Sequence, residues 1–180
     1  MENRRDALIR EAFEHLARHG FEGLRLRAVA TDAGIDHSTL HHHFRTKEDL
    51  VAAVVQYASS QFWDTMPAGG DPAERLSAHL ATLTDMIRAR PALFAVLNEM
   101  RGRATRDPAT AATVHRYEEG WREALAGLLE AGVTSGAFPA GLDVGAAVEL
   151  IIGVTKGVND SPERATAAFG ELERLLRSTP

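Results

Sequence analysis

Apolar residues recur at intervals of three and four along almost every long segment of the chain, with polar residues between them. One such stripe comprises Leu8, Ile9, Ala12, Phe13 and Leu16, and another comprises Val114, Tyr117, Trp121, Leu125 and Leu128. No segment alternates strictly between apolar and polar residues over the length of a strand. Because a period near 3.6 places the apolar residues on one face of a helix, the sequence predicts an all-helical fold.

Capping residues and helix breakers divide these stripes into separate helices. Asp71, Asp107 and Ser161 each precede a proline, which places a side-chain oxygen before a residue suited to the first helical position. Residues 132–141 contain three glycines and a proline and are predicted to form a loop. We therefore predict helices over residues 4–19, 26–33, 37–44, 47–65, 72–89, 91–103, 108–131, 143–158 and 162–177.

Residues 20–50 combine two short helices with a tight turn, which is typical of a helix-turn-helix. Gly34 can adopt the left-handed conformation that ends a helix, and Asp36 can cap the helix that follows. Leu40 and Phe44 give the second helix an inward face. A rotation of about 100° per residue then turns four side chains outward, with a fifth at the edge. These candidates for base and phosphate contacts are Ser38, Thr39, His41, His42 and, at the edge, His37.

Two further residues near this unit are candidates for contacts with phosphates. Thr46 and Asp49 are spaced as a capping box, which would leave Lys47 free near a backbone phosphate. Arg27 flanks the unit on its other side. Between Ala28 and Phe44 there are four histidines and neither lysine nor arginine. Histidine titrates between pH 5 and 8, so we expect DNA affinity to rise as the pH falls from about 8 to about 6.

These residues resemble the DNA-binding domain of TetR-type transcription regulators over about residues 4–55. The resemblance rests on the following matches: Ala12-Phe13, Gly20-Phe21, Val29-Ala30, Ala33-Gly34-Ile35, Thr39-Leu40, His43-Phe44 and Lys47-Glu48-Asp49-Leu50. Two positions depart from the usual pattern, since Arg25 stands where the family has a capping threonine and His41 where it has a tyrosine. The resemblance implies a DNA-binding domain over residues 1–46, and a helical effector-binding and dimerisation domain over residues 47–180.

The resemblance also implies an effector pocket within the central helices. The aromatic and methionine residues that would line it are Phe62, Trp63, Met86, Phe94, Met100, Tyr117 and Trp121. Four polar residues of this region, His79, Asn98, Glu99 and His115, could orient a ligand.

The last two helices are expected to form a dimer interface, as the resemblance implies a four-helix arrangement between two subunits. Gly153 and Gly157 would allow close approach there. The predicted interface residues are Val148, Ile151, Ile152, Thr155, Phe169, Leu172 and Leu176.

The charge and composition of the chain are compatible with a DNA-binding regulator. The formal net charge of −5 disfavours a wholly basic nucleic-acid binder, yet one DNA-reading element can be carried on an acidic body. The chain has no cysteine, no signal-peptide pattern and no apolar run long enough to span a membrane. We therefore expect a cytoplasmic protein without a cofactor. The resemblance implies a homodimer, which would repress transcription from an inverted-repeat operator until an apolar or amphipathic small molecule releases it.

Two other functions fit parts of the sequence. One is a helical enzyme or metal-binding bundle, because six of the eight histidines lie within the first 43 residues. Consecutive residues of a helix point about 100° apart, so of the recognition-helix histidines only His37 and His41 share a side. Two such ligands make a poor metal site, and no catalytic motif is present; neither a metal site nor an enzyme is expected. The other function is an architectural DNA binder without an effector.

Overall fold

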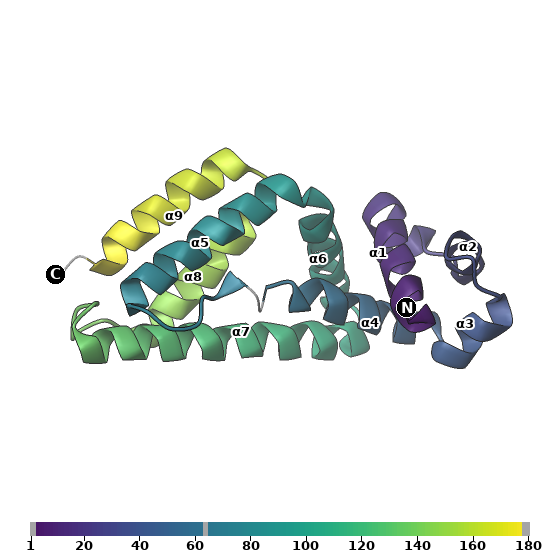
Figure 1. The fold of residues 1–180 in the computed structure, drawn as a ribbon, viewed down its shortest axis with the longest axis horizontal. Coiled ribbons are helices and arrows are strands. Elements are labelled where there is room, and N and C mark those ends of the chain that lie inside the picture. The colour runs from purple at the N-terminus through teal and green to yellow at the C-terminus, as the bar shows by residue number, and fades with distance from the viewer. Residues whose placement is uncertain (1–2, 63–64, 178–180) are drawn as a thin grey trace. The chain divides into compact units, whose positions relative to one another are not determined.

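The computed structural model describes residues 3–62 and 65–177, and this part of the chain contains nine α-helices and no strand (Figure 1). The helices are α1 (Arg4–Gly23), α2 (Leu26–Asp32), α3 (His37–His43), α4 (Lys47–Ser60), α5 (Pro72–Ala89), α6 (Pro91–Ala104), α7 (Pro108–Ser135), α8 (Val144–Val158) and α9 (Pro162–Arg177). The all-helical prediction is confirmed. None of the described helices combines the length and apolar character that crossing a membrane requires.

The chain divides into two compact units. The first comprises Met1–Gln61 and Ala92–Tyr117, and the second comprises Phe62–Pro91 and Glu118–Pro180. In the first unit α1 packs against α2, α3 and α4. In the second, α9 packs against both α5 and α8 (Figure 1). These units group α4 and α6 with the helix-turn-helix, whereas the sequence placed a boundary after residue 46.

The predicted capping residues account for several of the helix starts. Asp71 accepts hydrogen bonds from the backbone N–H groups of Ala73 and Glu74 at 2.9 and 3.2 Å. Thr46 and Asp49 form the predicted capping box, with both hydrogen bonds at 3.0 Å. Asp36 stands at the cap of α3, but its side chain makes no capping hydrogen bond. That part of the prediction is wrong, and α3 starts without a side-chain cap.

Two helix ends differ from the prediction for local reasons. Helix α4 ends at Ser60 rather than residue 65, and Ser60 and Gln61 both donate side-chain hydrogen bonds to the carbonyl of Tyr57. Helix α7 continues through Gly132 to Ser135. A Cβ atom at Gly132 would lie 2.2 Å from the ring of Phe138. This glycine therefore serves close packing, and the chain turns only at Gly136, where φ is 80°.

Candidate nucleic-acid interface

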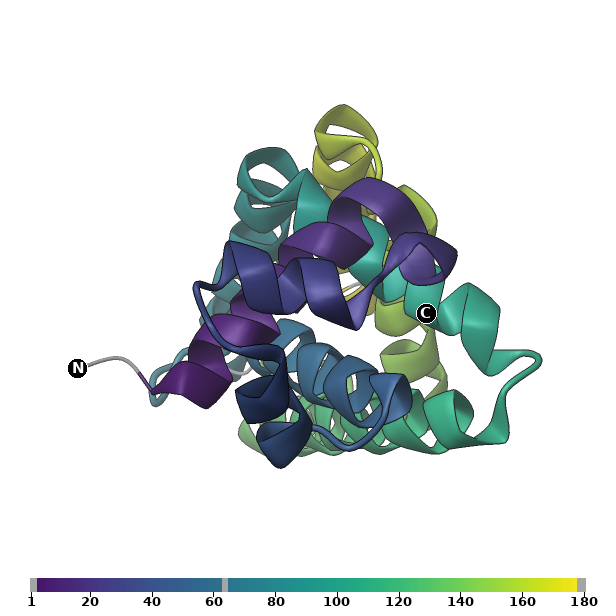
Figure 2. The same ribbon diagram turned by 90° about the vertical axis from the view of Figure 1, so that its right-hand side faces the viewer.

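A tight turn joins α2 to α3 in the way the sequence predicts. Gly34 has φ of 65°, a left-handed conformation that glycine adopts without a steric penalty. The N–H of Gly34 donates to the carbonyl of Thr31 at 3.0 Å, and that of Ile35 donates to the carbonyl of Ala30 at 2.9 Å. Figure 2 shows α1, α2 and α3 in purple and dark blue. The turn thus fixes the direction in which α3 leaves α2.

Buried contacts hold α3 on the unit. Leu40 and Phe44 are both buried, and the guanidinium of Arg5 lies 5.2 Å from the centre of the Phe44 ring. A further polar contact joins α1 to α2, because the Nε2 atom of buried His15 donates to a carboxylate oxygen of Asp32 at 2.8 Å. The inward face predicted for α3 is confirmed by this burial, and the three helices present one fixed surface.

The residues of α3 that were predicted to contact DNA differ in their exposure. Ser38, His41 and His42 are exposed, while His37 and Thr39 are half-buried. Arg27 on α2 is exposed as well. Polar side chains that are exposed on a helix suit contacts with base edges in the major groove.

Two histidines of α3 contact each other through their ring nitrogens. The Nε2 atoms of His37 and His41 are 3.1 Å apart, and the rings meet edge to face with centres 4.4 Å apart. Such a hydrogen bond requires one imidazole to donate and the other to accept, so at least one Nε2 atom carries no proton. Within the described residues, the Nδ1 atom of His37 is buried without a hydrogen-bond partner.

Lys47 is engaged within the protein, contrary to the prediction that it is free. Its ammonium donates to the backbone carbonyl of Phe21 at 2.6 Å and lies 4.0 Å from the centre of the Phe21 ring. Burial lowers the pKa of Lys47, with a smaller opposing effect of Glu22. The side chain ties the start of α4 to the end of α1, which the sequence did not indicate.

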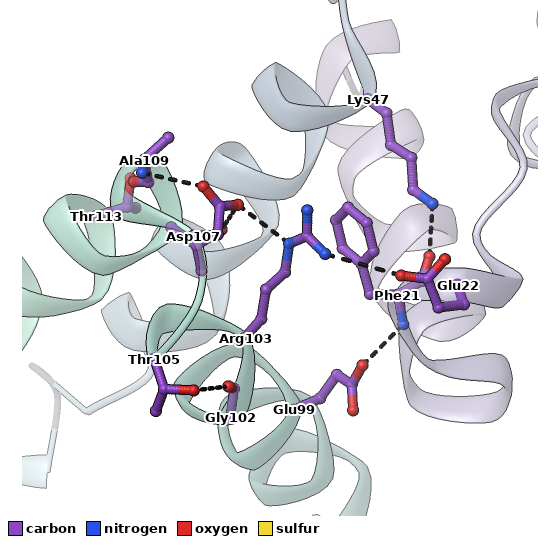
Figure 3. A network of polar contacts seen from close by, with 11 residues as sticks. Phe21, Glu22, Lys47, Glu99, Gly102, Arg103, Thr105, Asp107, Ala109 and Thr113 are labelled. Carbon is purple, nitrogen blue, oxygen red and sulfur yellow. Dashed lines mark hydrogen bonds and ion pairs between the residues drawn. The ribbon is translucent and has the colours of Figure 1, made fainter.

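A network around Phe21 links the helix-turn-helix to α6 (Figure 3). The backbone N–H of Phe21 donates to the Oε1 atom of Glu99 at 3.1 Å. The guanidinium of Arg103 lies 3.3 Å from the centre of the Phe21 ring and pairs with Asp107 at 3.1 Å and with Glu22 at 3.8 Å. We call Phe21, Lys47, Glu99 and Arg103 the α1–α6 junction. The sequence named Glu99 only as a candidate ligand contact.

The residues predicted to line an effector pocket fall in both compact units. In the first unit, Phe94 and Met100 are buried and Tyr117 is half-buried. In the second unit, Phe62, Met86 and Trp121 are half-buried. Trp63 lies outside the described residues. Among these side chains, the rings of Phe62 and Trp121 contact each other, with centres 6.1 Å apart and planes inclined by 39°.

A buried histidine positions this aromatic pair. The indole N–H of Trp121 donates to the Nε2 atom of His79 at 3.2 Å, and the Nδ1 atom of His79 lies 2.9 Å from the hydroxyl of Thr65. The Thr65 hydroxyl donates in turn to the carbonyl of Phe62 at 2.5 Å. Because an indole only donates, His79 must accept at Nε2 and is neutral. Burial agrees with this, lowering the pKa of His79 to about 4.

The α8 and α9 residues predicted for a dimer interface are buried within the chain itself. Val148, Ile151, Ile152, Thr155, Phe169, Leu172 and Leu176 are all 5% exposed or less. In the described part of the chain, the large apolar residues that are exposed are instead Leu150 and Leu175, at 56% and 55%. They line an apolar groove of about 480 Å³ between α8 and α9. A Cβ atom at Gly153 or Gly157 would meet no atom within 4 Å.

Comparison with known proteins matches both parts of the chain to one family. The pattern described as "Bacterial regulatory proteins, tetR family" matches residues 8–54, and that described as "Tetracyclin repressor-like, C-terminal domain" matches residues 66–155. The latter match covers half of the chain.

Individual relatives agree with these matches. The chain is 27% identical over 146 residues to the HTH-type transcriptional repressor KstR2 of Mycolicibacterium smegmatis, covering 79% of this chain and 71% of that protein. It is 24% identical over 149 residues to the fatty acid metabolism regulator protein of Bacillus subtilis, covering 81% and 76%. A TetR transcription regulator from Haloarcula marismortui has the same fold, with a TM-score of 0.87, 23% identity and 96% of each chain covered.

Proposed function

The chain belongs to the tetR family of DNA-binding transcription regulators, and we propose that it is a homodimeric repressor that an apolar or amphipathic small molecule releases from an inverted-repeat operator. Membership of this family assigns it to regulators rather than enzymes. The observation that carries the proposal is the turn at Gly34, which presents the polar face of α3 while Leu40 and Phe44 hold the helix from behind.

In the proposed complex, α3 lies in the major groove. Ser38, Thr39, His41 and His42 contact base edges and nearby phosphates, with His37 at the edge of the contact and Arg27 on the backbone. Lys47 is left out of this set, because the Phe21 carbonyl holds its ammonium. Between Ala28 and Phe44 there is neither lysine nor arginine, so the histidines of α3 would provide much of its polar contact. The boundaries 1–46 and 47–180 stay a prediction for the DNA-binding and effector-binding parts of the sequence.

We propose that two copies associate through the groove between α8 and α9. The support is an uncovered apolar surface centred on Leu150 and Leu175, beside two glycines that let a partner helix approach closely. A two-fold axis through this face would make the contact self-complementary, and a symmetric operator follows from a symmetric dimer. The α8 and α9 residues that the sequence predicted for the interface would then pack below this surface, inside each protomer.

The effector is proposed to bind against the half-buried pair of Phe62 and Trp121. An apolar or amphipathic ligand gains most from such rings, which offer large apolar area. His79 holds the indole in place but has no free nitrogen for the ligand, since both are hydrogen-bonded. The Bacillus subtilis relative is named for fatty acid metabolism, and a fatty acyl compound is therefore the first class to examine.

Release of DNA by such compounds tests the proposal. A DNA fragment selected from the source genome would be labelled, and its complex with the protein titrated with fatty acyl compounds and other amphipathic molecules. We expect one class to dissociate the complex and to change tryptophan fluorescence, with Trp121→Phe altering that change. If DNA is bound but no compound releases it, the effector-free architectural function is favoured instead.

A further inference from the structure

From the sequence alone, no metal is expected at two histidines, but the structure brings their imidazoles together. Exposed His41 and half-buried His37 lie one helical turn apart on α3, with their Nε2 atoms 3.1 Å from each other. We propose that His37 and His41 form a binding site for a divalent transition-metal ion of the class that prefers imidazole, such as Cu²⁺, Ni²⁺ or Zn²⁺. We further propose that an ion bound there competes with DNA for the surface of α3. The competition rests on the proposed role of α3 in reading DNA, whereas the metal site itself does not.

The distance between the two nitrogens carries the proposal. Two nitrogens 3.1 Å apart, each about 2.0–2.1 Å from one ion, subtend an angle of about 100° at that ion. This angle lies between the values of square-planar or octahedral and tetrahedral coordination, which are about 90° and about 109°. The two Nε2 atoms are therefore separated by the distance expected of adjacent ligands of one ion. Binding would require the rings to rotate so that both lone pairs point to that ion, and the helix itself could stay unchanged.

A change of tautomer would prepare the pair for a metal ion. Without metal, one Nε2–H bridges to the lone pair of the other Nε2 atom. In the form that binds a metal, each neutral ring carries its proton on Nδ1, and both Nε2 atoms present a lone pair. His41 is exposed, so water can complete the coordination. Because no described residue holds the Nδ1 atom of His37, we expect an exchangeable ion rather than a structural one.

The other histidine pairs of the first unit do not offer such a site. His15 and His19 have the same spacing in sequence, but the Nε2 atom of His15 is bonded to Asp32 and the ring centres are 5.6 Å apart. His42 and His43 are adjacent in sequence, and their ring centres are 5.7 Å apart. Within the described residues there is also no cluster of three or more His, Cys, Asp or Glu placed to hold a metal. His42 thus supplies a matched control on the same helix.

An ion at this position would occupy the surface that α3 presents to DNA. With its bound waters it would lie between the helix and the base edges, and it would remove two imidazoles from contact with DNA. Its effect on DNA binding would therefore be inhibition, and chelation would reverse it.

Calorimetric titration of the full-length, untagged protein with Ni²⁺ alone tests the site. The parent, His37→Gln, His41→Gln and His42→Gln would be compared at neutral pH. Mutation of a residue that hydrogen-bonds to a metal ligand weakens the metal affinity by about 10–100-fold. Loss of a ligand itself should therefore weaken the metal affinity at least about tenfold. We expect that loss for both His37→Gln and His41→Gln, and less than about twofold change for His42→Gln. Absence of binding by the parent, or equal loss in all three variants, would overturn the site.

Operator affinity in Ni²⁺ and in excess chelator tests the competition separately. For each protein, the operator affinity in Ni²⁺ is compared with the affinity of the same protein in chelator. We expect Ni²⁺ to lower the affinity of the parent and of His42→Gln. The affinity of His41→Gln should be the same in both conditions. If DNA binds equally in nickel and in chelator, competition is wrong while the proposed function stands. If no DNA binds even in chelator, the proposed function fails, and with it the competition, while the calorimetric result still decides the metal site.

Discussion

The Oε1 atom of Glu99 on α6 accepts a hydrogen bond at 3.1 Å from the backbone N–H of Phe21, 78 positions earlier in the chain. The contact falls just after Gly20, whose φ of 64° interrupts α1 and turns the following residues. Arg103, one turn further along α6, stacks on the ring of Phe21. Residues of α6 thus hold both the backbone and the side chain of Phe21, at the end of α1, in the α1–α6 junction (Figure 3).

Removing the carboxylate of Glu99 should weaken the contact between α1 and α6. We predict that Glu99→Ala lowers the free energy of unfolding by about 1 kcal/mol, because the half-buried N–H of Phe21 loses its acceptor. Glu99→Gln should retain most of the stability, since its amide oxygen can still accept. Urea denaturation measures both, with exposed Glu130→Ala as the control. Equal stability of Glu99→Ala and the parent would show that water replaces the contact without loss.

Lys47 is expected to act on stability rather than on phosphates. We predict that Lys47→Met lowers the free energy of unfolding by about 1 kcal/mol, since the bond to the Phe21 carbonyl is lost. The slope of log affinity for operator against log salt concentration should stay unchanged. Arg27→Met should reduce that slope by about one for each protomer that loses a phosphate contact. A similar reduction for Lys47→Met would return Lys47 to the DNA-contacting set.

Exposed and buried apolar residues of α8 should respond differently to a charge. We predict that Leu150→Glu yields folded monomers, because a carboxylate is placed in the proposed interface. Ile151→Glu should unfold the chain instead, since Ile151 is buried in the protomer. Light scattering and circular dichroism separate the two outcomes. Ala167→Glu, on an exposed part of α9 outside the groove, is the control. A dimeric Leu150→Glu would place the interface elsewhere.

The buried neutral histidine predicts a loss of stability in acid. The pKa of His79 is about 4 in the folded protein, compared with the ordinary histidine value of 6.5 that applies to the unfolded chain. Between these pH values the unfolded chain binds the proton and the folded chain does not. The contribution is therefore complete above about pH 6.5 and is lost as the pH falls towards 4, amounting to at most about 3 kcal/mol.

Comparison with a variant isolates this contribution. His79→Gln keeps an acceptor for the Trp121 indole but cannot titrate, so its unfolding free energy should fall less between pH 7 and pH 4.5 than that of the parent. His115→Gln, at an exposed position, should behave like the parent. Parallel pH profiles for the parent and His79→Gln would mean that the imidazole is not the group that titrates.

The features that sequence predicted well are local ones. The helix starts at Asp71 and Thr46 and the turn at Gly34 depend on residues within about one helical turn, so their signals lie together in the chain. The inward positions of Leu40 and Phe44 follow from helical period alone. For this reason the helix-turn-helix and the exposed side of α3 were predictable before any contact was known.

Features that depend on distant contacts were not predictable in the same way. The sequence pattern predicts that the Lys47 side chain is free to contact phosphate. Its actual partner is a backbone carbonyl 26 positions away, which no pattern of side chains reveals. Helix α8 is apolar around much of its circumference, and periodicity did not separate Ile151, which faces its own protomer, from exposed Leu150. The distance between His37 and His41 likewise follows from side-chain rotamers, not from their spacing in sequence.

Selection of genomic DNA fragments by the purified protein, followed by footprinting of the fragment it enriches, tests the central claim most directly. Reading of DNA by α3 in a two-fold dimer predicts one protected inverted repeat, with half-site centres one helical turn or a multiple of it apart. The Ser38→Ala and Thr39→Ala variants should change the preferred bases within each half-site. Failure to enrich any fragment over competitor DNA, or an unchanged base preference in both variants, would contradict it.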